Sequence, residues 1–128
     1  MLAEQILYDL LRHDAAVSAT VGDRIYPVRL PDEVILPAMA YLKASCVRYA
    51  AHGGPSKLAS SRFQLDCYSE DYLEAKRLAL AAVAALHGKK GGDVLAAFNE
   101  NETDGFNPDN GIFRVTADVL IWHKEEQL

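Results

Sequence analysis

The 128-residue sequence predicts an α+β fold, a four-stranded, mostly antiparallel sheet with helices on one face. Two observations lead to this prediction. Apolar residues recur with helical spacing in two stretches, and four other stretches alternate with the period of a β-strand. Their order is helix, strand, strand, helix, strand, strand, so a helical crossover joins two hairpins. We expect a single domain over residues 1–128, because this length leaves little room for a second one.

The N-terminal part of the chain predicts helix and then extended backbone. Residues 2–13 place their apolar side chains on one helical face, and a second short helical segment at 14–21 should end at Gly22. Three prolines within residues 25–37 exclude a helix there. An extended connection along the edge of the sheet is the expected structure.

Alternation predicts the first hairpin. Strands are expected at 38–49 and 62–68, with a loop of about ten residues at 50–59 between them, where small residues predominate. In the first strand, Ala38, Ala40, Leu42, Ala44 and Cys46 share one face, and Met39, Tyr41 and Val47 share the other.

The second half repeats the pattern with a longer helix. Ser69 is the expected N-cap of a helix over 71–87, which should end at Gly88. A strand is expected at 94–98, a polar acidic loop at 99–110 and the last strand at 113–122. The alternation and the helical stripe together predict these core residues: Phe63, Leu65, Leu78, Leu86, Val115 and Val119.

Charge excludes one class of function and suggests a contact between copies. The net charge of −5 argues against a nucleic-acid-binding surface. Residues 34–65 contain four basic and no acidic residues, whereas residues 99–111 contain four acidic and no basic ones. Solvated loops are one interpretation, and two complementary patches that join neighbouring copies are the other. The candidate interface residues are Lys43, Arg48, His52, Lys57, Arg62, Glu100, Glu102, Asp104 and Asp109.

A second candidate interface is the sheet face that the helices do not cover. We expect this outer face to carry a group of large apolar side chains, namely Met39, Tyr41, Val47, Leu120 and Trp122. An apolar patch of this size indicates an interaction surface. The alternative is a second helical layer over the same face.

The sequence contains no recognisable motif for catalysis or for binding a metal or cofactor. The four histidines are scattered, and the glycine- and lysine-rich stretches do not match a phosphate-binding loop. Residues 99–110 fail the pattern of a calcium loop at its sixth and twelfth positions. Cys46 and Cys67 are expected as free, buried, small apolar residues. We therefore expect no enzymatic activity, no metal and no cofactor. No apolar run is long enough to span a membrane, and the N-terminus does not resemble a secretory signal.

Several segments together resemble a known family. They are Ile25-Tyr26-Pro27, Leu30-Pro31, Leu36-Pro37-Ala38, Arg62 to Ser69, Tyr72 to Ala75, Ala85 to Gly88 and Gly111 to Val119. In this order and spacing, over about residues 3–120, they resemble the tail-completion family of long-tailed bacteriophages, the tail terminators.

The resemblance implies a structural role without catalytic residues. It implies a ring, usually hexameric, that caps the tail tube at its neck end, stops tube polymerisation and offers a surface to head-completion proteins, while DNA passes through the lumen unbound. Such a protein is made in the cytoplasm of the host bacterium, for a phage, a prophage or a gene transfer particle. The alternatives are another neck component, such as a head-closure or stopper protein, and a small α+β ligand-binding domain or enzyme.

Overall fold

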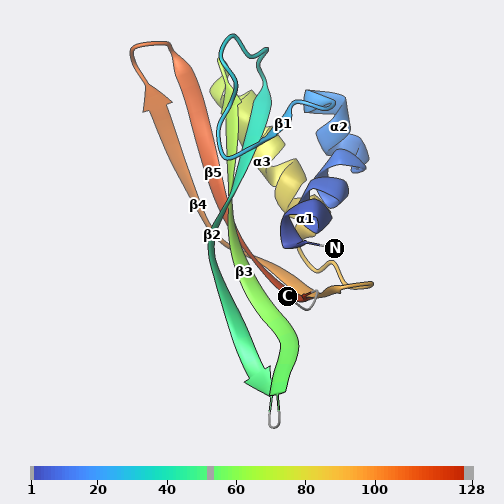
Figure 1. Ribbon diagram of the computed structural model, residues 1–128. Helices are drawn as coiled ribbons and strands as arrows, with labels where there is room; N and C mark the ends of the chain where they lie inside the picture. Colours follow the sequence, from blue (N-terminus) through green and yellow to red (C-terminus); the bar gives the residue numbers. More distant parts are fainter. Residues whose placement is uncertain (1, 52–53, 126–128) are drawn as a thin grey trace.

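The computed structural model describes residues 2–51 and 54–125 and has an α+β architecture. Its elements follow in chain order, and Figure 1 labels them: α1 (Ala3–Arg12), α2 (Ala15–Val21), β1 (Ile25–Pro27), β2 (Ala38–Ala51), β3 (Gly54–Ser69), α3 (Tyr72–Leu86), β4 (Val94–Asn107) and β5 (Ile112–Lys124).

The sheet has five strands in the order β1-β2-β3-β5-β4, one more than the sequence predicts. The four long strands pair antiparallel, as expected, whereas the additional β1 pairs parallel with residues 39–41 of β2. β1 is only three residues long and forms the first part of the proline-rich connection along the edge, which explains why alternation alone does not reveal it.

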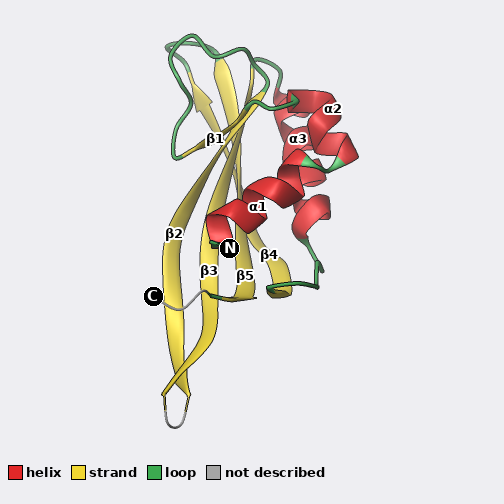
Figure 2. Ribbon diagram, turned by 45° about the vertical axis from the view of Figure 1, so that its right-hand side comes forward, coloured by secondary structure: helices red, strands yellow, loops and turns green. Residues whose placement is uncertain are grey.

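All three helices lie on one face of the sheet, as predicted (Figure 2). α3 packs on β3 and β5, and α1 and α2 pack against α3. All six predicted core residues are fully buried between these two layers. Small alanines on the inner side of α3, at 75, 79 and 82, are also fully buried and let the helix lie close to the sheet.

Two predicted loops are strands. Residues 50–59 continue β2 and β3, with Ala50 paired to Pro55 and Ala51 to Gly54, so only residues 52–53 separate the strands. Residues 99–107 are the second half of β4 and pair with β5 from Val119 to Ile112. In both places the pairing partner imposes a strand on residues with weak strand propensity of their own.

The start of α3 also differs from the prediction. Asp71, not Ser69, is the N-cap, and its side chain accepts a hydrogen bond from the Leu73 amide at 3.3 Å. Ser69 is still part of the turn, because its hydroxyl accepts from the Asp71 amide at 3.0 Å and donates to Glu74 at 2.7 Å.

The β2–β3 hairpin projects beyond the helical layer (Figures 1 and 2). We call its projecting part, residues 45–51 and 54–61, the arm. The arm begins just after an irregularity in β2 between Lys43 and Ser45, where Ala44 is an extra residue that has no partner on β3. Such a bulge reverses which face each following side chain occupies.

Candidate interaction surfaces

The sheet face opposite the helices carries an apolar patch on the half of the sheet that includes the arm. Registers place Val47, Ser60, Trp122 and Ala96 in one row across four strands, and Leu120 beside Phe98 in the next row. The Tyr49 ring stacks on the Trp122 ring, with centroids 5.3 Å apart. We call Val47, Tyr49, Phe98, Leu120 and Trp122 the outer patch. Val47 is 50% exposed and Phe98 46%.

Two predicted members of this surface lie on the other face. Met39 is fully buried in the core beneath the helices, and Tyr41 packs against that core beside Tyr8, with ring centroids 6.3 Å apart. Burial, followed by the nearby Tyr8 and Glu4, raises the pKa of Tyr41. The bulge at Ala44 explains the error, because strict alternation through position 44 puts Met39 and Val47 on one face.

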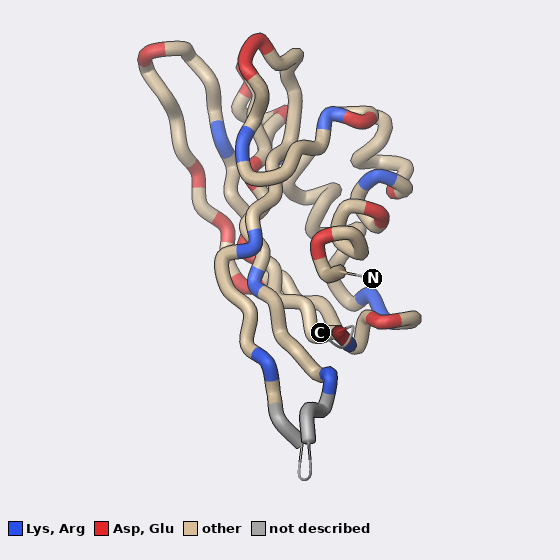
Figure 3. The backbone as a smooth tube through the Cα atoms, viewed as in Figure 1, with Lys and Arg blue, Asp and Glu red and all other residues tan. Residues whose placement is uncertain are grey.

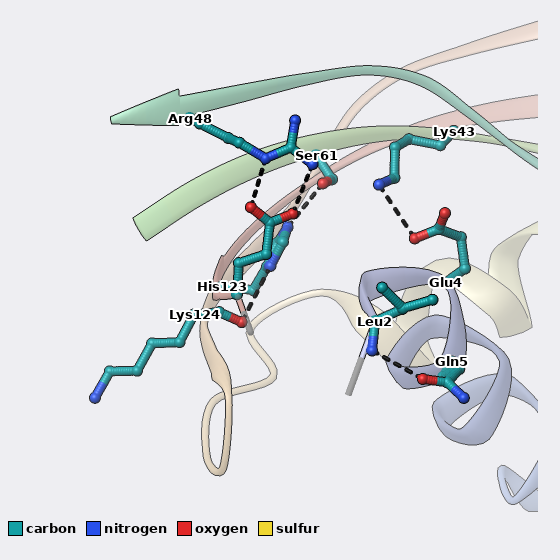
Figure 4. Close-up of polar contacts among 9 residues, drawn as sticks. Leu2, Glu4, Gln5, Lys43, Arg48, Ser61, His123 and Lys124 are labelled. Carbon is teal, nitrogen blue, oxygen red and sulfur yellow. Dashed lines mark hydrogen bonds and ion pairs between the residues drawn. The ribbon is translucent and has the colours of Figure 1, made fainter. Parts of the chain in front are cut away.

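Most of the predicted interface charges form ion pairs within the chain. Lys43 lies 3.1 Å from Glu4 of α1. Arg48 donates two hydrogen bonds to Glu125, at 2.6 and 2.9 Å (Figure 4). This contact lowers the pKa of Glu125 and raises that of Arg48. Both pairs hold β2 against parts of the chain that are distant in sequence.

The acidic residues of β4 are also held within the chain. Arg62 pairs directly with Glu100, so the basic and acidic stretches already contact each other within a single copy. Lys76 of α3 bridges Glu102 at 2.9 Å and Asp104 at 2.7 Å. The Tyr72 hydroxyl adds a 2.6 Å hydrogen bond to Asp104. Figure 3 shows basic residues along the β2–β3 hairpin and acidic residues along β4.

Lys76 and Asp104 stabilise each other's charged forms. The hydrogen bond from Lys76, followed by that from Tyr72, lowers the pKa of Asp104. The two carboxylate acceptors raise the pKa of Lys76. These three side chains hold the start of α3 against β4, which is an edge strand of the sheet.

The remaining predicted interface residues have different settings. Lys57 is exposed on the arm, where its backbone has a φ of 62° and its carbonyl accepts from the Glu125 amide at 2.7 Å. Asp109 lies in the turn between β4 and β5. His52 lies outside the described residues.

A buried polar pair at the base of the arm is not apparent from the sequence. The Ser61 hydroxyl and the His123 Nε2 are 2.7 Å apart, and both residues are completely buried (Figure 4). This hydrogen bond satisfies two polar groups between β3 and β5. The alternation of the last strand puts His123 on the core-facing side, which is the one signal that could have indicated its burial.

Helix α3 presents a second apolar surface that the sequence analysis missed. Leu73 is 54% exposed and Leu80 58% exposed, and both point away from the buried side of the helix. Arg77 and Ala84 lie on the same exposed side. We call Leu73, Arg77, Leu80 and Ala84 the α3 stripe. Its spacing of four, three and four residues is the signal that could have revealed it.

The family model for tail completion protein gp17 matches residues 5–124 of this chain. The chain belongs to this tail completion family. The match confirms the resemblance found in the sequence and identifies the protein as a structural component of a virion tail.

The fold of this tail completion protein also occurs in a solved assembly. A chain in the structure titled "Virion of native gene transfer agent (GTA) particle" aligns with a TM-score of 0.76. The alignment covers 92% of this chain and 91% of that one, at 18% sequence identity. Comparison with curated protein sequences gives no match.

Within residues 2–51 and 54–125, no group of three or more His, Cys, Asp or Glu side chains is placed to hold a metal ion. No helix of the described chain is long and apolar enough to cross a bilayer. A hollow of about 540 Å³ near the N-terminus of α3 is lined by Glu33, Glu70, Asp71 and Glu74 together with apolar side chains. Its polar lining provides carboxylates and the Ser69 hydroxyl, which is already bonded to Glu74.

Proposed function

We propose that this protein assembles as a ring on the end of the tail tube, stops tube polymerisation and provides the surface to which the head is joined. The observation that carries this proposal is membership of the tail completion family over residues 5–124. The ring is expected to be a hexamer. Its partners are other copies of itself, the tail tube protein and a head-completion protein, and its place is the neck end of the tail, after synthesis in the host cytoplasm.

The surface of the chain supports assembly rather than chemistry. It has apolar surfaces on both sides, the outer patch and the α3 stripe, and an arm that extends beyond the body. Extended hairpins and exposed apolar patches are typical of surfaces that bind other proteins. Nothing in this proposal requires catalysis, and DNA passes through the ring without specific binding, in keeping with the net charge of −5.

A further hypothesis is that the oppositely charged stretches 34–65 and 99–111 fix the alignment of neighbouring copies. Exposed ion pairs contribute only about 0–1 kcal/mol each, so apolar surface must supply most of the affinity. Because Arg62 already pairs with Glu100 in one copy, reversing Glu100 perturbs the subunit as well as the ring. Lys57 and Asp109 are the better positions for this test, since both lie outside those intrachain clusters.

Tube polymerisation in vitro tests the proposed function. Purified tail tube protein is polymerised with increasing amounts of this chain, and tube lengths are measured by electron microscopy. We expect shorter tubes and a ring at one end of each. A control in which the chain is added after polymerisation ends should leave tube length unchanged, because a cap does not break tubes.

Three results would contradict the proposal. Tube lengths that do not depend on this chain would refute termination. Binding to a portal or adaptor protein, with no binding to the tube, would favour a head-closure or stopper role instead. Retention of DNA on a filter by the assembled protein would contradict passage of DNA without binding.

A further inference from the structure

The apolar surfaces of this protein lie on opposite faces of the molecule. The outer patch is on the uncovered face of the sheet, and the α3 stripe is on the helical layer that covers the other face (Figures 1 and 2). The two surfaces therefore cannot meet within one copy. They can meet when copies stack in the same orientation, face to back.

We propose that the outer patch of one copy packs on the α3 stripe of the next copy, and that this contact joins the subunits. The inference rests on the proposed function, because it specifies the contact that closes the ring. A contact between two different surfaces of identical chains is heterologous, and heterologous contacts generate rings when the rotation closes.

The dimensions of the two surfaces agree. From Leu73 to Ala84 the α3 stripe runs 11 residues, or about 16 Å at 1.5 Å per residue. The row from Val47 on β2 to Ala96 on β4 crosses three strand spacings, or about 14 Å. A row of this width receives one helix, and its side chains provide the apolar centre that specific interfaces contain.

Charge also favours this pairing. Arg77 lies within the α3 stripe, exposed between Leu73 and Leu80. Asp118 is two residues before Leu120 on the same face of β5, about 7 Å along the strand. Its carboxylate has a 3.4 Å hydrogen bond from Asn101 and is half-buried at the edge of the outer patch. Arg62 also lies on this face, opposite Leu120, but its charge is offset by its ion pair with Glu100. Arg77 on the α3 stripe and Asp118 at the edge of the outer patch are thus opposite charges that can meet between copies.

A stable contact buries about 800 Å² on each partner. The outer patch and the α3 stripe form the centre of such an area, with neighbouring polar residues as its rim. By contrast, contact of the outer patch with itself would make a closed two-fold dimer and leave Leu73 and Leu80 exposed to water.

Two single substitutions separate these arrangements. Val47→Glu places a charge in the outer patch, and Leu80→Glu places one in the α3 stripe. Both positions are at least half exposed, so both variants should fold, which circular dichroism checks. Ile35→Glu is the matched control, since Ile35 is 71% exposed and belongs to neither surface. Assembly is followed by native mass spectrometry, alone and with tail tube protein.

The expected result has a specific signature. The wild type and the Ile35→Glu control assemble alike. Each of the other two variants is monomeric, with affinity lower by at least about 100-fold, because the contact would bury an unpaired charge. An equal mixture of the two variants forms a 1:1 dimer and nothing larger, because only one intact pair of surfaces remains per pair of chains.

The charged pair gives an independent readout. Arg77→Asp or Asp118→Arg alone should weaken assembly about fivefold or more, and the double exchange should restore it. Restoration identifies Arg77 and Asp118 as neighbours across the contact. Equal weakening in the double variant contradicts their pairing.

Other outcomes overturn the inference. If the Leu80→Glu variant assembles like the wild type, or if the mixture stays monomeric, the α3 stripe is not the partner surface. If only the Val47→Glu variant is monomeric and the Leu80→Glu variant is a dimer, the outer patch contacts itself. A wild-type chain that stays monomeric, alone and with tube protein, refutes the ring and hence the proposed function as well.

Discussion

Replacing Leu78 by alanine should test the packing of α3 on the sheet. Leu78 is completely buried in the middle of the helix. The substitution removes three carbon atoms from the core, at about 0.8 kcal/mol each, and leaves a partial cavity that adds about 1–2 kcal/mol. The expected loss is therefore about 3–4 kcal/mol in the free energy of unfolding.

The same helix provides a matched control. Leu80→Ala makes the identical chemical change two residues away, where the side chain is 58% exposed. Helix propensity changes equally at both positions, so the difference between the variants isolates burial. We expect the Leu80→Ala variant to lose less than about 0.5 kcal/mol.

Urea unfolding and thermal melting followed by circular dichroism measure both variants. A loss of about 3–4 kcal/mol lowers the melting temperature of a chain of this length by about 10–15 °C. Measurements at two protein concentrations separate folding from self-association, because association makes the apparent stability concentration-dependent. Equal losses in the two variants, or a loss below about 1 kcal/mol for Leu78→Ala, would refute the placement of α3.

Three further predictions concern the polar contacts and the thiols. Lys76→Gln should lower the urea midpoint at pH 7. Because the pKa of Asp104 is lower in the folded chain than its ordinary 3.8, this stabilisation is present above that pH and is lost as the pH falls below it. The variant and the wild type should therefore converge at low pH, and parallel pH profiles would contradict the assignment. Arg48→Gln should speed amide hydrogen exchange in the arm but not in α3, and unchanged exchange in the arm would show that the ion pair does not hold it. A thiol reagent should label Cys46 in the native chain but label Cys67, whose pKa burial raises, only in urea, and native labelling of Cys67 would argue against its burial.

The regular helices and strands of the fold could be predicted from the sequence. Repeating apolar positions indicate the helices and at least part of each of the four long strands. The burial of Phe63, Leu78 and Val119 follows from the same periodicity. These residues are decided by local pattern, because one side of each element must face the core.

The rest depends on pairing between distant segments. Residues 99–107 contain Asn, Glu and Asp in a pattern that resembles a loop, and they form a strand because β5 offers them a partner. The face of Met39 is fixed by the single unpaired residue Ala44, which no periodicity reports. The ion pair between Arg62 and Glu100 likewise requires β3, β5 and β4 to lie side by side, and only the topology provides that.

The candidate surfaces also differ in how far local sequence pattern predicts them. Leu120 and Trp122 were correctly placed on the outer face, because the last strand is regular from end to end. The spacing of the α3 stripe is visible in the sequence, but it is masked by the buried stripe, which accounts for most of the apolar residues of the same helix.

The extra residue at Ala44 puts the body and the arm of the hairpin out of phase. Deleting that residue would exchange the two faces of everything distal to it on β2, turning Val47 towards the helical side and Cys46 away from it. Adding or removing two residues per strand within the arm, in contrast, preserves the phase and changes only how far the hairpin extends, by about 7 Å. The length of the arm can thus be altered in whole steps without repacking the body, so its reach is set independently of the fold that carries it.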